Sequence, residues 1–218
     1  MAIKSIVQSL QSPPHAAGYI NACGLPAARQ AIANFHGKHC HGDVLTLDHV
    51  IVASGCSGAL ELALTALLDE GSILLVPQPG FPLYQVIAES HGAQVVQYPL
   101  DPERNWECDF QQLRALVNNK LKGCDVRGIV INNPSNPTGA VFSKQHLQEI
   151  AQFCDEHCLP IIADEVYGDL TFGSHTFYPM AEIAWELGRN VPVITASGIG
   201  KQFLLPGWRV GWIVFQDK

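Results

Sequence analysis

The stretch HVIVASGCSGALELALTALLDEGSILLVP, residues 49–77, contains a strand, a helix and a second strand in that order. HVIVAS (49–54) and SILLVP (72–77) are short apolar runs of the kind that form buried strands, whereas CSGALELALTALL (56–68) is apolar on nearly every side, as a buried helix is. A strand, a crossover helix and another strand make up the unit of a parallel sheet.

The same alternation continues along most of the chain. Further strands are predicted at 93–100, 127–133, 159–164, 191–197 and 209–215, and further helices at 81–92, 109–121 and 144–157, with Ser143 capping the last helix. No repeat, linker or low-complexity segment interrupts the pattern. We therefore predict one α/β domain, in which a mainly parallel seven-stranded sheet lies between helices.

Composition excludes several classes of protein. Of the 218 residues, 47% are hydrophobic and 15% charged, which is typical of a soluble α/β domain. The formal charge of −7, with only 13 lysines and arginines, argues against binding to nucleic acid or to an anionic membrane. No apolar run approaches the length of a membrane span, and the first residues resemble neither a signal nor a transit peptide. Seven scattered cysteines, an odd number, predict reduced thiols and a cytoplasmic protein.

Polar residues stand at the carboxyl ends of four predicted strands. They are Ser54, Asn132 with Asn133, Asp164 and Ser197. Ligands of open α/β sheets bind at that edge. Each residue alone would be interpreted as a turn residue or a helix cap, but four strands ending in this way favour a binding site.

An anion site is predicted where the strand at 49–54 meets the helix that follows it. Gly55, Cys56 and Ser57 place unpaired backbone N–H groups and the positive end of the helix dipole there, which could hold a phosphate. Arg209 offers a planar fork to a phosphate dianion, and Ser197 offers a hydroxyl. The glycine-rich turn by itself is also typical of ordinary turn chemistry.

Two further motifs follow central strands. NNPSNPTG (132–139) contains two Asn-Pro steps, which could hold an amide side chain in a rigid loop. In IIADEVYGDL (161–170), a buried Asp164 requires a cationic partner such as a protonated ring nitrogen, and Tyr167 could reach the same ligand. The alternative is that Asp164 caps a helix and Tyr167 only packs.

One lysine stands among apolar and small residues in ITASGIGKQFLLPGWRVGW (194–212). Apolar surroundings would disfavour the ammonium form of Lys201 and lower its pKa, which would make the amine a nucleophile toward an aldehyde, as Schiff-base chemistry requires. The alternative for Lys201 alone is a surface lysine whose stem packs while its charge stays in water.

Metal ligation was weighed for HGKHCH (36–41) and CDEHC (154–158), which concentrate histidines and cysteines. An ordinary loop and a polar helix end are the favoured interpretations, because a metal needs three or four converging ligands. The pair Asp164 and Glu165 is better explained by a cofactor contact than by a metal.

Three motifs together carry a resemblance. NPSNPTG, ADEVYGD and SxxxKxxxLPGWRxGW resemble the fold type I aminotransferases that depend on pyridoxal 5'-phosphate (PLP). The match runs from about GYINACGLPAAR (18–29) to the end of the chain, and SGCS, PQPGFPLY and LLPGWRVGW are most similar to the tyrosine aminotransferase group.

The resemblance implies roles for individual residues. Lys201 would form a Schiff base with the cofactor and shuttle a proton, Asp164 would pair with the pyridinium nitrogen, and Tyr167 and Asn136 would bind the phenolic oxygen of the ring. Phe81 would stack on the ring. The residues implied at the phosphate are Gly55, Cys56, Ser57, Ser197 and Arg209, with Tyr19 reaching the phosphate of a partner subunit in a homodimer.

The implied activity is transfer of the amino group of an L-amino acid, aromatic and similar to tyrosine, to a 2-oxo acid such as 2-oxoglutarate. The alternatives are a PLP-binding chain without catalytic activity and a lyase similar to aminocyclopropane-carboxylate synthases or cysteine-conjugate β-lyases. We expect residues 1–30 to lead into a PLP-binding large domain at 31–218. We also expect the C-terminal small domain of the family, with its substrate-binding arginine, to be absent from this chain.

Overall fold

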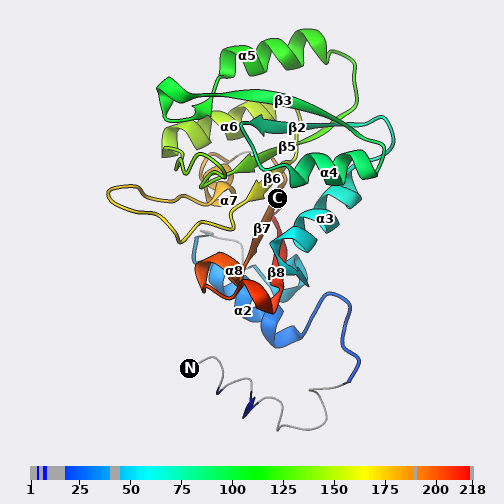
Figure 1. Ribbon diagram of the computed structural model, residues 1–218, viewed down its shortest axis with the longest axis vertical. Helices are drawn as coiled ribbons and strands as arrows, with labels where there is room; N and C mark the ends of the chain where they lie inside the picture. Colours follow the sequence, from blue (N-terminus) through cyan, green and yellow to red (C-terminus); the bar gives the residue numbers. More distant parts are fainter. Residues whose placement is uncertain (1–3, 5–6, 9–17, 40–44, 189–190, 217–218) are drawn as a thin grey trace.

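An eight-stranded sheet forms the centre of the molecule (Figure 1). The computed structural model describes residues 4, 7–8, 18–39, 45–188 and 191–216. The strand order across the sheet is β1-β8-β7-β6-β5-β2-β3-β4. The strands are β1 (Val50–Ser54), β2 (Ile73–Gln78), β3 (Gln94–Asp101), β4 (Glu107–Cys108), β5 (Val126–Asn132), β6 (Ile161–Asp164), β7 (Val193–Gly198) and β8 (Val210–Gln216).

The predicted sheet is confirmed. The neighbouring strands β3, β2, β5, β6 and β7 are parallel, and β8 is antiparallel to both β7 and β1. All seven strands expected from the apolar runs are present. The eighth, β4, is an edge strand of only two residues that pairs antiparallel with β3. A strand that short has no detectable sequence period.

Helices cover the sheet on both faces (Figure 1). The helices are α2 (Pro26–His36), α3 (Gly55–Leu67), α4 (Leu83–Ser90), α5 (Phe110–Ala115), α6 (Lys144–Glu156), α7 (Met180–Glu186) and α8 (Ile199–Gln202), and a π-helical turn (Leu116–Lys120) continues α5. Ser143 caps α6 as predicted, because its side chain accepts a hydrogen bond from the His146 backbone N–H. The sequence analysis missed α2, α7 and the short helix α8.

Side chains that alternate along the central strands face two main cores, one on each side of the sheet. Leu75 and Ile161 face the core beneath α5, α6 and α7, whereas Leu74 and Ile162 face the core beneath α3 and α4. A smaller core joins α2 to β1 and β8. The side of the sheet that a strand-end residue faces therefore follows from its position along the strand.

The parallel strands end together at one edge of the sheet. Asn132 pairs with Asp164, and Asp164 pairs with Ala196, in the register of β5, β6 and β7. Gly198, at the end of β7, lies opposite Gly211 of β8. This edge is where ligands of open α/β sheets bind.

Among the described helices, none is both long and apolar enough to cross a membrane.

Candidate active site

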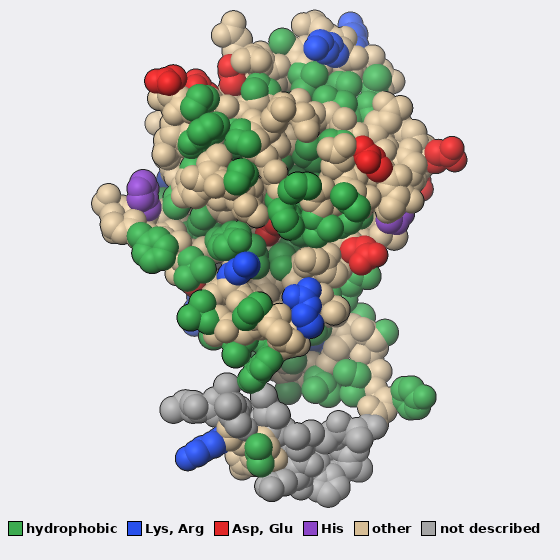
Figure 2. Space-filling model, in the orientation of Figure 1, with side chains coloured by type: hydrophobic (Ala, Val, Ile, Leu, Met, Phe, Trp, Pro, Cys, Tyr) green, Lys and Arg blue, Asp and Glu red, His purple; other side chains and the backbone are tan. Residues whose placement is uncertain are grey.

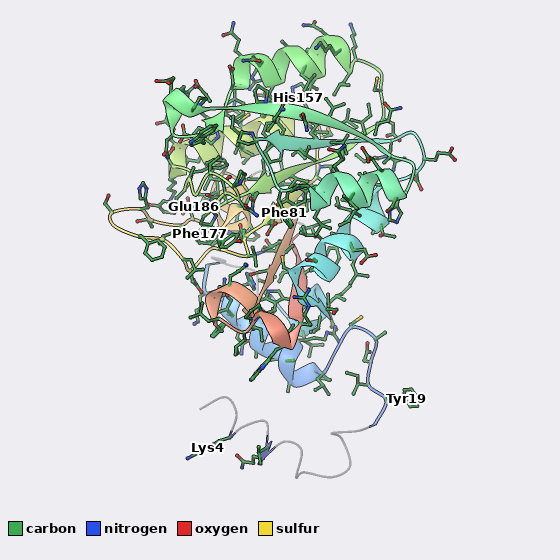
Figure 3. All side chains as sticks on the ribbon, viewed as in Figure 1. Lys4, Tyr19, Phe81, His157, Phe177 and Glu186 are labelled. Atoms are coloured by element: carbon green, nitrogen blue, oxygen red, sulfur yellow. The ribbon has the colours of Figure 1, made fainter. Side chains whose placement is uncertain are left out.

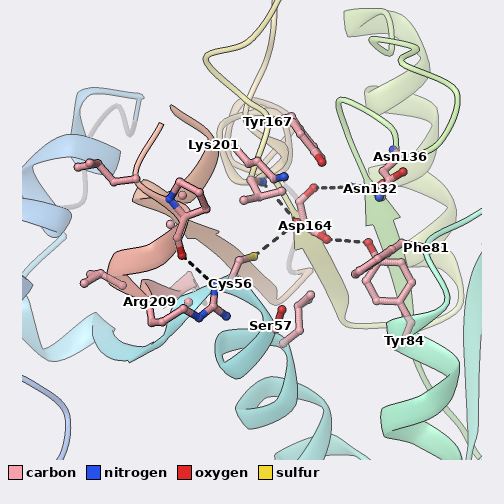
Figure 4. Close-up of a pocket in the computed structure, with 18 residues that line it drawn as sticks. Cys56, Ser57, Phe81, Tyr84, Asn132, Asn136, Asp164, Tyr167, Lys201 and Arg209 are labelled. Carbon is pink, nitrogen blue, oxygen red and sulfur yellow. Dashed lines mark hydrogen bonds between the residues drawn. The ribbon is translucent and has the colours of Figure 1, made fainter. Parts of the chain in front are cut away.

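A pocket of about 290 Å³ opens at the carboxyl ends of the strands (Figure 4). This volume is near the lower end of the roughly 300–1,000 Å³ range of ligand pockets. Nine of the eleven predicted site residues line it, together with residues for which no role was predicted. The lining residues are Gly55, Cys56, Ser57, Leu60, Phe81, Tyr84, Asn132, Asn136, Asp164, Val166, Tyr167, Gly198, Gly200, Lys201, Leu205, Pro206, Arg209 and Val210.

Asp164 is the buried carboxylate of the pocket, with 4% of its surface exposed. Burial raises its pKa, and hydrogen bonds from Tyr84, the Val166 backbone and Cys56 act in the opposite direction. The Tyr84 hydroxyl donates to Oδ2 at 2.6 Å and the Val166 N–H to Oδ1 at 3.3 Å, while the Cys56 Sγ lies 3.7 Å from Oδ1. No cationic side chain is among these hydrogen-bond donors. A cationic group in the pocket would therefore find a partially compensated buried acid.

The loop after β5 is tied to Asp164 by an asparagine. Asn132 donates from Nδ2 to the Asp164 backbone oxygen at 3.2 Å and accepts at Oδ1 from the Asn136 N–H at 2.7 Å. These two bonds place Asn136 at the pocket wall. Both Asn-Pro bonds of the loop are cis. The sequence analysis noted Asn132 at a strand end but missed its place in the pocket.

Gly55 and Arg209 come together at one end of the pocket. Gly55 begins α3 with φ of +71°, and its N–H donates to the Arg209 backbone oxygen at 3.0 Å. A Cβ on Gly55 would lie 2.5 Å from Arg209 Nη2, so the guanidinium occupies the space that any side chain would need. Arg209 itself has left-handed backbone geometry, with φ of +51°. The expectation of an unpaired N–H at Gly55 is therefore not met. The backbone N–H groups of Cys56 and Ser57, the guanidinium and the Ser57 side chain form a donor set suited to an anion.

Lys201 lies on the opposite wall, on the one-turn helix α8 (Figure 4). Its Nζ is 5.5 Å from the centre of the Tyr167 ring. The expectation that apolar neighbours enclose it is not met, because Lys201 is exposed. Phe203 and Leu204 are also exposed, at 57% and 79% of their surface. This short apolar segment lies at the surface, where hydrophobic side chains are spread around the region of α8 with few charges among them (Figure 2).

The aromatic residues of the pocket are Phe81, Tyr84 and Tyr167. The rings of Phe81 and Tyr84 meet edge to face, with centroids 5.8 Å apart and an angle of 84° between the planes. Phe81 is 36% exposed and Tyr84 is buried. Phe81 therefore offers a ring at the pocket wall, supported from behind by Tyr84.

Ser197 and Tyr19 do not line this pocket, and Tyr19 was predicted for the pocket of a partner subunit. Ser197 has the same strand parity as Val193, which faces the core beneath α6 and α7, so its side chain points away from the pocket. It lines a second cavity of about 340 Å³ with Glu165 and Gln202, and among the described residues its buried Oγ has no hydrogen-bond partner. Tyr19 is fully exposed and lies far from the labelled pocket residue Phe81 (Figure 3).

Among the described residues, no group of three or more histidines, cysteines, aspartates and glutamates is arranged to hold an ion. Cys40 and His41 of the HGKHCH segment lie outside the residues that the structure describes. The six described cysteines are all free thiols.

Comparison with known proteins identifies the family. The model for aminotransferase class I and II matches residues 2–218. The chain belongs to the class I and II aminotransferases. It is 47% identical over 201 residues to a tyrosine aminotransferase of Dictyostelium discoideum, covering 92% of this chain and 46% of the relative. The tyrosine aminotransferase of Mus musculus is 44% identical over 201 residues, with 92% and 42% covered.

Solved structures support the same membership. The tyrosine aminotransferase of Leishmania infantum superposes with a TM-score of 0.86 at 34% identity, covering 99% of this chain and 51% of that one. An Escherichia coli aminotransferase superposes with a TM-score of 0.89 at 32% identity, with 99% and 50% covered. The chain thus spans about half the length of the relatives and structures it matches.

This aminotransferase family uses PLP, and the pocket residues fit that cofactor. PLP carries an anionic phosphate, a basic ring nitrogen and an aldehyde. The pocket supplies one group for each: the donors around Gly55 and Arg209, the buried carboxylate of Asp164 and the amine of Lys201. Because Gly55 has no side chain, the Arg209 guanidinium can lie directly against it. This close approach fits a site that binds an anion.

Proposed function

We propose that this chain is a PLP-dependent transaminase, or the cofactor-binding part of one. It would transfer the amino group of an L-amino acid to a 2-oxo acid such as 2-oxoglutarate. The observation that carries the proposal is the presence of Lys201, Asp164 and Arg209 on the walls of a single pocket. An aromatic donor similar to tyrosine is supported by the names of the two relatives from Dictyostelium discoideum and Mus musculus.

PLP, when bound, supplies an electron sink that stabilises negative charge at the Cα of an amino acid. The residues of this chain would hold and orient the reacting groups. Asp164 would hold a proton on the ring nitrogen, because its buried carboxylate gains most from a cationic neighbour. Gly55, Cys56, Ser57 and Arg209 would bind the phosphate at the start of α3.

The remaining pocket residues would act on the reacting side. The Lys201 Nζ would act first as a general base, taking a proton from the Cα of the amino acid. It would then act as a general acid, giving a proton to C4′, the aldehyde carbon of the cofactor. Tyr167 and Asn136 would donate hydrogen bonds to a phenolic oxygen, and Phe81 would lie against the ring. The centre of the Tyr167 ring lies 5.5 Å from the Lys201 Nζ, so both residues face the same part of the pocket.

We further propose that residues 31–218 form the PLP-binding large domain and that the chain acts as a homodimer. Full exposure of Tyr19 supports this, since a side chain directed away from its own subunit is available to a partner's phosphate site. Analytical ultracentrifugation of the chain and of Tyr19→Phe, with and without PLP, tests the assembly.

The transaminase proposal is tested by a half-reaction. The purified chain is loaded with PLP, freed of excess cofactor and mixed with L-tyrosine. We expect one equivalent of the 2-oxo acid per bound cofactor, conversion of the cofactor to its amine form, and recovery of the original absorbance on addition of 2-oxoglutarate. Lys201→Ala serves as the control and should yield neither change.

The other outcomes identify the alternatives. A cofactor absorbance that no amino acid changes would overturn the transaminase proposal and favour a PLP-binding chain without catalytic activity. Release of ammonia together with an eliminated side-chain group would instead favour a lyase.

A further inference from the structure

We propose that Tyr84 is a positioning residue of this site, whose hydroxyl keeps the Asp164 carboxylate ionised and in one orientation, so that it can pair with a protonated ring nitrogen. This inference rests on the proposed use of PLP. Tyr84 is the last residue of the PQPGFPLY motif, but the predicted site residues did not include it.

The contact joins helix α4, which packs on one face of the sheet, to the end of strand β6. Tyr84 lies on α4 and Asp164 ends β6, and their O–H···O distance is 2.6 Å (Figure 4). Tyr84 is 1% exposed and Asp164 is 4% exposed. A distance this short is typical of a hydroxyl that donates to an ionised carboxylate.

The hydroxyl is the strongest of the three hydrogen-bond donors around the carboxylate. The Val166 N–H approaches Oδ1 at 3.3 Å, and the Cys56 thiol is a weak donor whose sulfur is 3.7 Å away. Among the described residues, only Tyr84 donates a hydrogen bond to Oδ2. Loss of its hydroxyl would leave Oδ2 without its described partner in a buried site, which favours the protonated acid.

Tyr84 is also suited to remain a donor. Burial and the nearby charge of Asp164 raise the pKa of the Tyr84 phenol well above its usual value, so the hydroxyl retains its proton at neutral pH. Burial raises the pKa of Asp164, and the Tyr84 hydrogen bond acts against that change. The hydrogen bond therefore has a defined direction, with the Tyr84 hydroxyl as donor and the Asp164 carboxyl as acceptor.

The charge of Asp164 can be read out by comparing two ligands. PLP has a ring nitrogen that can be protonated, whereas its analogue with C–H in place of that nitrogen has none. A carboxyl group that is held facing the ring nitrogen favours PLP over this analogue, because the two groups share a proton that the analogue lacks. A carboxyl group that has lost its orientation loses part of that preference. The ratio of the two dissociation constants thus reports on the carboxylate and not on general stability.

The experiment measures both dissociation constants by absorbance titration for the full 218-residue chain and for Tyr84→Phe. We expect the substitution to reduce the preference for PLP over the analogue about tenfold, the size of one hydrogen bond to a charged group. Tyr84→His restores an N–H donor on a planar ring and should recover part of the preference. It also provides a second variant if the phenylalanine form is poorly soluble.

Tyr98→Phe is the matched control. Tyr98 is also 1% exposed, and its hydroxyl donates to the Val130 backbone oxygen at 2.7 Å. Tyr98→Phe thus loses a buried hydrogen bond of similar length, and Tyr98 does not line the pocket. Its thermal stability should fall while the ligand preference stays at the wild-type value.

The outcomes separate this inference from the function on which it rests. Wild-type preference for PLP with a reduced preference in Tyr84→Phe supports the positioning role. An unchanged preference in Tyr84→Phe, or an equal loss in Tyr98→Phe, overturns the role of Tyr84 and leaves the proposed function intact. Absence of PLP binding by the wild-type chain overturns both.

Discussion

Substitution of Gly55 by alanine tests the anion site through a single methyl group. At φ of +71° an alanine is strained, which costs about 1–2 kcal/mol of folding free energy. The new Cβ would also lie 2.5 Å from Arg209 Nη2 and 2.8 Å from its Cζ. Since neither distance is possible, the guanidinium must move away from the start of α3.

The two effects can be separated by a second glycine. Gly71 has φ of +79°, and nothing lies within 4 Å of the Cβ that an alanine would add there. Gly71→Ala therefore carries the same backbone strain without displacing Arg209. For a chain of this size, about 1–2 kcal/mol lowers the melting temperature by about 2–8 °C, and both variants should show at least this decrease.

Only Gly55→Ala should change phosphate recognition. Hydrogen bonds to a charged group contribute about 1.5–3 kcal/mol, and about 1.4 kcal/mol corresponds to a tenfold change in affinity. We therefore expect Gly55→Ala to reduce the preference for PLP over pyridoxal, which lacks the phosphate, by about 10- to 100-fold. The assay is titration with each ligand, followed by absorbance. A wild-type preference in Gly55→Ala would refute the assignment of phosphate binding to Gly55 and Arg209.

Two further predictions concern Glu165 and the serines. Burial raises the pKa of Glu165 from 4.5 to about 8, so between those pH values the folded chain holds a proton that the unfolded chain has released. Glu165 therefore makes the free energy of unfolding fall as pH rises through that window, by up to about 1.4 kcal/mol per pH unit. Urea unfolding of Glu165→Gln should show a free energy of unfolding that changes less with pH. An equally steep profile in Glu165→Gln would contradict this. Ser57→Ala should weaken PLP binding several-fold while Ser197→Ala leaves it unchanged, because only Ser57 lines the pocket, and a larger loss in Ser197→Ala would contradict the placement of that side chain.

The strands and most of the pocket could be predicted because their signals are local. Apolar runs indicate the strands, and a carboxylate such as Asp164 at the end of a buried strand has few inexpensive structural roles. The loop containing Asn136 and the turn at Gly55 carry residues with restricted or unusual backbone geometry. Such residues mark a site without knowledge of the tertiary structure.

The remaining features depend on which face of an element is in contact. In the sequence, Tyr84 is one of several apolar or aromatic residues of an amphipathic helix. Its hydroxyl reaches Asp164 because of the way α4 packs on the sheet, which the sequence does not reveal. Ser197 stands at a strand end like Asp164, but its strand parity directs it to the other face. The apolar composition around Lys201 predicts burial, yet a segment of short helical turns at the surface does not enclose it.

The central claim is that the amine of Lys201 reacts with the aldehyde of the cofactor. The direct measurement is borohydride reduction of the PLP-loaded chain, followed by digestion and mass spectrometry. We expect the peptide that contains Lys201 to gain the mass of one reduced pyridoxyl phosphate group, while the peptide with Lys144, which pairs with Glu186 at the surface, stays unmodified. A Lys201 peptide without this mass, or equal modification of Lys144, would contradict the account.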